Sequence, residues 1–249
     1  MIDVGQGDSI LVSFPNNGGN VLIDTSGDTM NYESSNNVGN KIMPYLKTVG
    51  ITQIDYLVVS HGDFDHMGEG INLVNNFKVD NVIFNCGPYN DLEKELIKVL
   101  NKKKIKYYAC IRELRISGYK MYFLNTREYD NENDNSSVVY FNYEGYKFLF
   151  MGDAGIEKEQ DILNKYNIGD IEVLKVGHHG SNTSSSSEFI DSISPKYSFI
   201  SVGKYNRYGH PMASVLDALN DSVVYRTDVD GSVEVRISKS GYKIRNWSP

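Results

Sequence analysis

The sequence predicts an α/β fold in which two mixed sheets pack against each other and helices cover their outer faces. Three observations lead to this prediction. The first part of the 249-residue chain is rich in hairpin patterns, the later part alternates strand and helix patterns, and apolar residues make up 40% of the composition. That apolar content suffices for a substantial core, and no repeat, linker or boundary interrupts the pattern. We therefore expect residues 1–249 to form one domain.

The elements of the first half can be justified in chain order. Residues 9–14 and 21–24 predict a hairpin, because a Gly/Asn-rich turn separates two apolar runs. Residues 25–37 are rich in Ser, Thr, Asn and Gly and predict a loop. Apolar residues at helical spacing over 38–49 predict a helix that Pro44 either starts or kinks. The same patterns predict strand 54–59, helix 67–76, strand 80–85, helix 91–104 and strand 105–109.

The second half begins with three strands and then alternates. Residues 119–124, 137–142 and 146–151 are the strands, and Glu144 and Gly145 supply the hairpin turn between the last two. The elements that follow are helix 155–166, strand 171–176, helix 186–193, strand 197–202, helix 212–220 and closing strands 223–227, 232–238 and 242–246.

The charge of the chain limits the classes of function. A formal net charge of −7 argues against a domain that binds nucleic acid through overall basicity. Two bound divalent ions would add about four positive charges at a site, so an anionic substrate stays compatible with an acidic surface.

The cysteines and the ends of the chain give weaker signals. Cys86 and Cys110 are far apart and not in a C-x-x-C arrangement; one disulfide is possible, but we expect two buried free thiols. No apolar run reaches eighteen residues and no signal segment precedes the fold. Almost no strand precedes the glycine loop of residues 2–8, so we expect the chain to be a piece of a larger protein.

The segment 61–66, His-Gly-Asp-Phe-Asp-His, is the most informative part of the sequence. It places two imidazoles and two carboxylates directly after the apolar run 54–60. A strand that ends in four such side chains is how a rigid sheet edge holds a metal ion. The alternative is a polar turn whose histidines cap a helix, but turn chemistry requires Asn, Gly or Asp and not two imidazoles. We therefore expect a metal site here.

The remaining histidines also follow predicted strands. Asp153 comes after an apolar strand, where an aspartate is as often only an N-cap. His178 and His179 stand as a pair between glycines, which a purely structural role explains poorly, whereas His210 alone would fit either role. All five histidines of the chain lie at strand-to-loop junctions, and histidines packed in a core would not sort in this way.

Taken in order, these motifs resemble those of the metallo-β-lactamase fold superfamily, and within it the C-terminal domains of ComEC-type DNA-uptake competence proteins. The matching segments span nearly the whole chain: Asp3 to Asp8 (DVGQGD), Leu22 to Thr25 (LIDT), His61 to His66 with Gly68, Asn133-x-x-Ser136, Met151 to Ala154 (MGDA), His178 to Ser181 (HHGS) and Gly209 to Pro211 (GHP). Each glycine loop is a weak signal alone, but the order is highly specific.

The resemblance implies an αββα sandwich with a binuclear metal site at one rim, between the sheets. Carried over position by position, it implies that His61 and Asp63 bind the first metal, that Asp65 and His66 bind the second, and that Asp153 bridges the two.

The resemblance also implies further site residues. The spacing of His210 after the bridging aspartate assigns His210 to the second metal. His178, His179 and Asp65 are the implied catalytic residues, and which of the paired histidines points inward stays open. Asp24 either orients a ligand histidine or simply ends a strand. The residues expected on the substrate side are Ser181, Asn133, Ser136, Lys204 and Arg207.

Two departures from the family pattern bear on the metal. Many members have histidine where this chain has Asp63, and another ligand histidine where this chain offers only Asn133, Asn135 or Ser136. The first site is therefore rich in oxygen, which favours harder ions. We expect two divalent ions, Mn²⁺ or Zn²⁺, with Mg²⁺ as a further option. The same departure weakens the case for β-lactam hydrolysis.

The resemblance implies a metal-dependent hydrolase, a phosphodiesterase or nuclease acting on DNA during competence DNA uptake. Two alternatives remain: a hydrolase of a small phosphodiester or lactone, and a non-catalytic, metal-stabilised domain that binds DNA or positions partners. The implied partners are DNA, as a single strand or duplex end, and the other domains of a membrane DNA-uptake protein, with no nucleotide cofactor. We expect a soluble domain tethered to the bacterial cell membrane on its extracytoplasmic side.

Overall fold

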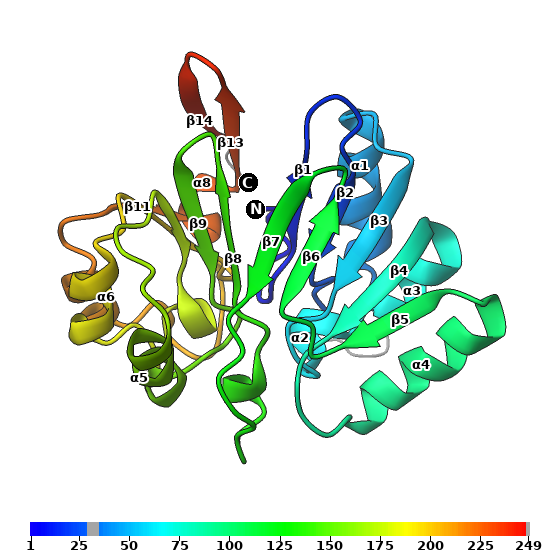
Figure 1. The fold of residues 1–249 in the computed structure, drawn as a ribbon, viewed down its shortest axis with the longest axis horizontal. Helices are drawn as coiled ribbons and strands as arrows, with labels where there is room; N and C mark the ends of the chain where they lie inside the picture. The colour runs from blue at the N-terminus through cyan, green and yellow to red at the C-terminus, as the bar shows by residue number, and fades with distance from the viewer. Residues whose placement is uncertain (29–34, 248–249) are drawn as a thin grey trace.

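The computed structural model describes residues 1–28 and 35–247, in which two sheets pack face to face between outer layers of helices (Figure 1). The first sheet has the strand order β1 (Ile10–Ser13), β2 (Asn20–Ile23), β3 (Gln53–Val58), β4 (Lys78–Phe84) and β5 (Lys106–Ala109). The second has the order β12 (Val223–Arg226), β11 (Tyr197–Ile200), β10 (Val173–Lys175), β9 (Tyr146–Phe150), β8 (Val139–Tyr143), β7 (Tyr119–Phe123) and β6 (Glu113–Ile116). This arrangement confirms the predicted fold class.

The helices form one layer on each side of the sandwich. Those over the five-stranded sheet are α1 (Met43–Thr48), α3 (Gly70–Asn76) and α4 (Asp91–Lys103). Those over the seven-stranded sheet are α5 (Ile156–Lys165), α6 (Ser187–Ile193) and α7 (Ala213–Ala218). The loops contain short helical segments: η2 (Val38–Ile42), α2 (Phe64–Met67), η3 (Asn133–Asn135), η4 (Gly177–Gly180) and α8 (Thr227–Asp230). No helix among the described residues is both long and apolar enough to cross a membrane.

Alternating side chains on the strands supply three apolar layers. Leu57 of β3 points toward the helices while its neighbour Val58 points toward the opposite sheet. Leu149 of β9 likewise faces its helices, and Phe148 faces the interior of the sandwich, where it stacks on Phe141 of β8 with ring centroids 4.7 Å apart. Because successive side chains of a strand point to opposite faces, a strand segment covered on both sides is apolar at consecutive positions, as Leu57–Val58 and Phe148–Phe150 are.

Parallel pairing brings the loops of the two sheets to one rim. In the first sheet β2, β3 and β4 are parallel, and in the second β9, β10, β11 and β12 are parallel. The carboxyl ends of parallel strands meet at the same edge of a sheet, which is where open α/β sheets place their sites. The segments that follow β3, β9 and β10 are those of His61, Asp153 and the pair His178-His179.

A glycine loop near the start of the chain closes this rim. The backbone N–H of Asp8 donates to the carbonyl of Asp65 (3.1 Å), and the Ser201 hydroxyl donates to the carbonyl of Gly7 (2.6 Å). Gly7 has φ +119°, and a Cβ there would lie 2.2 Å from the Asp65 carbonyl oxygen. Only glycine fits this approach, so the loop joins the metal motif to the end of β11.

Several predicted elements differ from those observed. The strand β6 was not predicted, and β13 (Ser232–Ser238) and β14 (Gly241–Trp247) form a hairpin of their own instead of joining a main sheet. The predicted helix 38–49 divides into η2 and α1, and Pro44 lies in the first turn of α1, where its missing N–H costs nothing. The loop predicted over 25–37 falls partly on residues 29–34, which lie outside the described residues.

The expectation of two buried free thiols was wrong, because Cys86 and Cys110 form a disulfide. Their Cα atoms are 4.5 Å apart across 24 positions of sequence, Cys86 is half-buried and Cys110 is exposed. The two residues follow the adjacent parallel strands β4 and β5, whose register places Phe84 opposite Ala109. Distance along the chain gave no sign of this, since the contact depends on strand order.

We expect the double substitution Cys86→Ser, Cys110→Ser to lower the free energy of unfolding by about 3 kcal/mol, from the entropy of a closed loop of this size. Urea unfolding followed by circular dichroism measures the loss, and the wild-type protein in reductant should shift to match the variant. Equal unfolding midpoints in oxidised wild type and variant would contradict the expectation.

Candidate metal centre

The segment 61–66 bends so that both of its histidines enter the space between the sheets. His61 follows β3, Asp63 is the extended N-cap of the single-turn helix α2, and His66 lies on that turn. The carbonyl of Gly62 accepts from the Asn90 side chain (2.7 Å), and its N–H donates to Glu132 (2.9 Å). These contacts to neighbouring loops fix the path of the segment, and His61 and His66 are fully buried.

His66 is at the centre of the buried cluster. Its Nδ1 lies 2.8 Å from Oδ2 of Asp24, so the other ring nitrogen is directed away from that carboxylate. Nε2 lies 3.1 Å from Oδ1 of Asp153 and 3.3 Å from Nε2 of His179. Asp24 also accepts from the backbone N–H and the hydroxyl of Ser60 (2.7 and 2.6 Å), which fixes the carboxylate itself.

His61 presents a free nitrogen to the same space. Its Nδ1 lies 3.1 Å from the Ser60 hydroxyl and 3.3 Å from the Ser136 hydroxyl, while Nε2 is buried without a hydrogen-bond partner among the described residues. Ser136 also accepts from the backbone N–H of Asp153 (3.1 Å). The carboxylate of Asp63 is half exposed, with Oδ2 3.7 Å from Nε2 of His61.

The donor atoms of this cluster suit a metal ion. One ligand atom each from His61, His66 and Asp153 lies within 4.8 Å of the others, and so do atoms from Asp65, His66 and His179. Oδ1 of Asp153 lies 3.1 Å from Nε2 of His66 but makes no well-aligned hydrogen bond. Buried polar atoms without partners are costly, and converging imidazole and carboxylate donors are what divalent ions bind.

Electrostatics within the cluster point to a site for cations. Burial opposes the charged form of His66, but Asp153 and Asp24 outweigh it and raise the pKa of His66 well above its usual value. Burial likewise opposes charge on His179, and Asp153 and Asp65 raise its pKa. Burial would raise the pKa of Asp153, yet His66 and His179 hold it well below its usual range. Without metal, protons on imidazoles balance the carboxylates.

A buried ion pair lies behind the cluster. The Lys175 ammonium is 1% exposed and 2.6 Å from Oδ2 of Asp8, and it donates to the carbonyl of Gly152. Oδ1 of Asp8 is 3.5 Å from Nδ1 of His179, which in turn lies 2.8 Å from the carbonyl oxygen of Ser201. These contacts leave Nε2 of His179 directed toward Asp65, 3.3 Å away.

The structure distinguishes the paired histidines. His179 is buried in the cluster, whereas His178 is 26% exposed in its side chain and has Nε2 3.7 Å from Asp153. Both have left-handed backbones, with φ of +46° and +54°, and Nε2 of His179 lies 3.6 Å from the same carboxylate of Asp153. Nδ1 of His178 lies 3.0 Å from the Thr183 hydroxyl, which contacts the hydroxyl of Ser181. Burial lowers the pKa of His178.

His210 lies farther out than the sequence suggests. Its ring is 5.9 Å from that of His178 and stacks on Tyr208 at 5.6 Å. Nδ1 is buried without a hydrogen-bond partner among the described residues, and burial lowers the pKa of His210 to about 4. The structure thus brings His179, and not His210, against Asp65.

The predicted substrate-side residues fall in different places. Ser181 and Ser136 are buried, and the Ser136 hydroxyl contacts His61 and the backbone N–H of Asp153. Asn133 is half-exposed on η3, and Lys204 and Arg207 are exposed on the loop before His210.

Sequence reasoning gave no site role to Asp8, Ser60 or Thr183. It also did not predict that Lys175 pairs with Asp8. Asp8 was visible in the DVGQGD motif, and a lysine within an apolar strand was a signal for Lys175, because a lysine is almost never fully buried unless it is paired. Nothing local marked Ser60 or Thr183.

We expect Asp24→Asn to weaken metal affinity by about 10- to 100-fold, because a carboxylate that orients a ligand imidazole is replaced by a neutral amide. Competition with a fluorescent chelator measures the affinity. Asp55→Asn, a change in a carboxylate of the same sheet that accepts a backbone hydrogen bond from Asn20, serves as the matched control. Unchanged affinity in a normally folded Asp24 variant would contradict the role.

Comparison with known proteins agrees with this geometry. The family model of the metallo-beta-lactamase superfamily matches residues 2–204. ComE operon protein 3 of Bacillus subtilis (strain 168) is 36% identical over 255 residues, covering 95% of this chain and 32% of that protein. Competence protein ComA of Neisseria gonorrhoeae is 31% identical over 247 residues, covering 97% and 32%. The chain spans about a third of the length of these relatives.

Solved structures support the fold. CmlA, a diiron beta-hydroxylase from Streptomyces venezuelae, has a TM-score of 0.56 at 13% identity and covers 89% of this chain and 53% of that chain. Zn²⁺-bound PqqB from Methylobacterium extorquens has a TM-score of 0.55 at 12% identity and covers 90% and 85%. At these identities the likeness concerns the fold, on which different chemistries occur.

Proposed function

Because the chain belongs to the metallo-β-lactamase superfamily, we propose that it is a metal-dependent hydrolase that cleaves phosphodiester bonds of DNA during competence DNA uptake. The observation that carries the hydrolase assignment is the buried cluster of His61, His66, His179, Asp65 and Asp153 with its partnerless donor atoms. The proposal of a DNA substrate is based on the relatives, which are competence proteins.

The cluster can be divided between two divalent ions. His61, His66 and Asp153 would hold one, with Asp63 beside them, and Asp65 and His179 would hold the other, with Asp153 shared. In this assignment His179 takes the place expected for His210. The carboxylates give the set enough oxygen for Mn²⁺ or Mg²⁺ as well as Zn²⁺. Such ions, when bound, supply a Lewis acid and lower the pKa of bound water.

Residues around the cluster orient its ligand atoms and exclude water from the back of the site. Asp24 holds a proton on Nδ1 of His66 and so keeps Nε2 available as a ligand. Lys175 and Asp8 close the back of the site to water. His178 is the histidine of η4 that solvent reaches, and its hydrogen-bonded Nδ1 leaves Nε2 facing Asp153. We assign to His178 the contact with a phosphate oxygen or the leaving oxygen.

The Cys86–Cys110 disulfide supports a location of the domain outside the reducing cytosol, as expected for a domain on the extracytoplasmic side of the membrane. Maleimide labelling of intact cells before and after reduction tests this location. Labelling that appears only after reduction would support it, and labelling without reduction would contradict it.

The test of function is incubation of single- and double-stranded DNA with the protein and Mn²⁺, Mg²⁺ or Zn²⁺. We expect Asp65→Ala to lower the rate at least about 100-fold, because a metal ligand is lost. Asp91→Ala, at a fully exposed carboxylate on α4, is the control and should leave the rate unchanged. Cleavage that persists in the Asp65 variant would point to a contaminant. Hydrolysis of bis-p-nitrophenyl phosphate without cleavage of DNA would assign a small phosphodiester substrate instead.

A further inference from the structure

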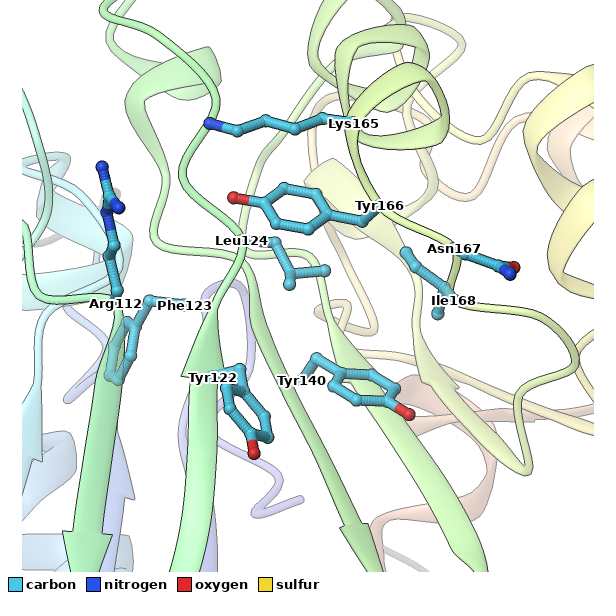
Figure 2. A pocket seen from close by; sticks show the side chains of 9 residues that line it. All are labelled: Arg112, Tyr122, Phe123, Leu124, Tyr140, Lys165, Tyr166, Asn167 and Ile168. Atoms are coloured by element: carbon cyan, nitrogen blue, oxygen red, sulfur yellow. The ribbon is translucent and has the colours of Figure 1, made fainter.

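A hollow of about 420 Å³ lies on the outer face of the seven-stranded sheet, where β7 and β8 pass beyond α5 (Figure 2). We call it the tyrosine groove; the residues that matter here are Arg112, Tyr122, Leu124, Tyr140, Lys165 and Tyr166. None of its lining residues is acidic. The protein as a whole has a net charge of −7, so the local charge of the groove is opposite in sign to that of the chain.

Strand alternation forces the aromatic rings outward. Met121 and Phe123 of β7 are buried between the sheets, so Tyr122 points to the opposite face, where it is 36% exposed. Tyr140 of β8 lies directly opposite Tyr122 in the antiparallel ladder, with ring centroids 6.4 Å apart. The two rings, tilted by 36° to each other, form an aromatic surface beside the end of α5 (Figure 2).

Two cations border the groove. Arg112 extends from the segment before β6 and has no acidic partner among the described residues. Lys165, at the last position of α5, donates to the carbonyls of Asn125 and Thr126 and lies 5.4 Å from the ring centre of Tyr166. Because no carboxylate neutralises either contact, both charges stay available to an anion.

The groove is connected to the metal centre by two rigid paths. Helix α5 begins three residues after Asp153, has Gly155 as its N-cap and ends at Lys165. Ten helical residues span about 15 Å. Leu124, in the floor of the groove, pairs with Val138 at the end of the loop that carries Ser136.

We propose that the tyrosine groove binds the single strand of DNA whose phosphodiester enters the metal centre. This rests on the proposed function and names the form of its substrate. Tyr122 and Tyr140 stack on unpaired bases, and Arg112 and Lys165 contact the phosphates that run beside these bases. A duplex keeps its base faces stacked inside, so an exposed aromatic surface next to cations fits a single strand and not a double one.

Binding is measured without cleavage, by fluorescence anisotropy of a fluorescein-labelled twelve-nucleotide oligothymidylate in EDTA. We expect Tyr122→Ala to raise Kd by about 5-fold to 100-fold, the range for loss of one stacked base, and Tyr122→Phe to retain the wild-type value. Arg112→Gln should lower the slope of log affinity against log salt by about 0.7, one single-strand phosphate contact. Tyr108→Ala, at an exposed tyrosine of β5 in the other sheet, should change nothing.

The outcomes separate the groove from the nuclease. If Tyr122→Ala and Arg112→Gln both bind like the wild type, or if duplex binds as tightly as single strand, the groove assignment is overturned while cleavage of DNA can still be observed. If both variants lose binding but keep their hydrolysis of bis-p-nitrophenyl phosphate, the groove is supported. If binding is lost in the variants and the wild type cleaves no DNA with any metal, the groove stands and the nuclease assignment fails.

Discussion

Replacing Lys175 by methionine is expected to lower the free energy of unfolding by about 3–5 kcal/mol, the cost of removing one partner of a buried ion pair. Lys175 is 1% exposed and Asp8 is equally buried, so neither charge has water to replace the other. Oδ1 of Asp8 already makes no hydrogen bond, and the variant would leave the whole carboxylate without a cation except His179. The side-chain volume is nearly kept, which limits any packing contribution.

Urea unfolding in EDTA measures this loss, and the double variant Asp8→Asn, Lys175→Met is the informative control. If the penalty is an uncompensated charge, the second substitution should restore a large part of the stability, because replacing both partners is far less costly than removing one. Equal losses in single and double variants would show that Lys175 acts through packing alone. Lys196→Met, at an exposed lysine, should have little effect.

Metal binding is expected to release one or two protons, so that affinity rises by about tenfold per pH unit for each proton while the pH is below the raised histidine pKa values. The direction of this pH dependence follows from the charges within the cluster. Asp153, Asp24 and Asp65 raise the pKa values of His66 and His179, so both imidazoles hold protons without metal at pH values where a free histidine would be neutral. Each must lose the Nε2 proton before it can bind an ion.

Isothermal calorimetry in two buffers of different ionisation enthalpy counts the protons released, and repetition between pH 6 and pH 8 gives the affinity change. His210→Gln is the matched control, because burial lowers the pKa of His210 to about 4 and leaves it neutral throughout this range. The proton count of that variant should equal that of the wild type. Affinity that does not change with pH would show that His66 and His179 are neutral in the metal-free protein.

Much of the centre could be predicted because its residues belong to local patterns. His61 and His66 lie on one turn after a strand, and Asp153 ends another strand, so a sheet with parallel strands brings them together. That His179 lies against Asp65 could not be predicted from spacing along the chain, because it depends on the left-handed backbone of η4.

The sandwich was predictable for the same reason, since near-continuous apolar runs indicate which strands are covered on both faces. The strand β6 was not, because its sequence Glu-Leu-Arg-Ile is short, carries two charges and lies at a sheet edge. The disulfide and the pair of Asp8 with Lys175 join positions 24 and 167 residues apart, and such contacts depend on strand order, which no local pattern contains.

The glycine loop has a consequence for the time at which the metal centre can form. Gly7 accepts a hydrogen bond from Ser201 across 194 positions, and Asp8 is bonded to Asp65. Contacts of such sequence separation carry a high loop-closure entropy and form late in folding. The side chains of residues 61–66 therefore reach their final positions only after a strand more than a hundred residues later has been synthesised and has packed. Metal binding then follows folding and does not initiate it.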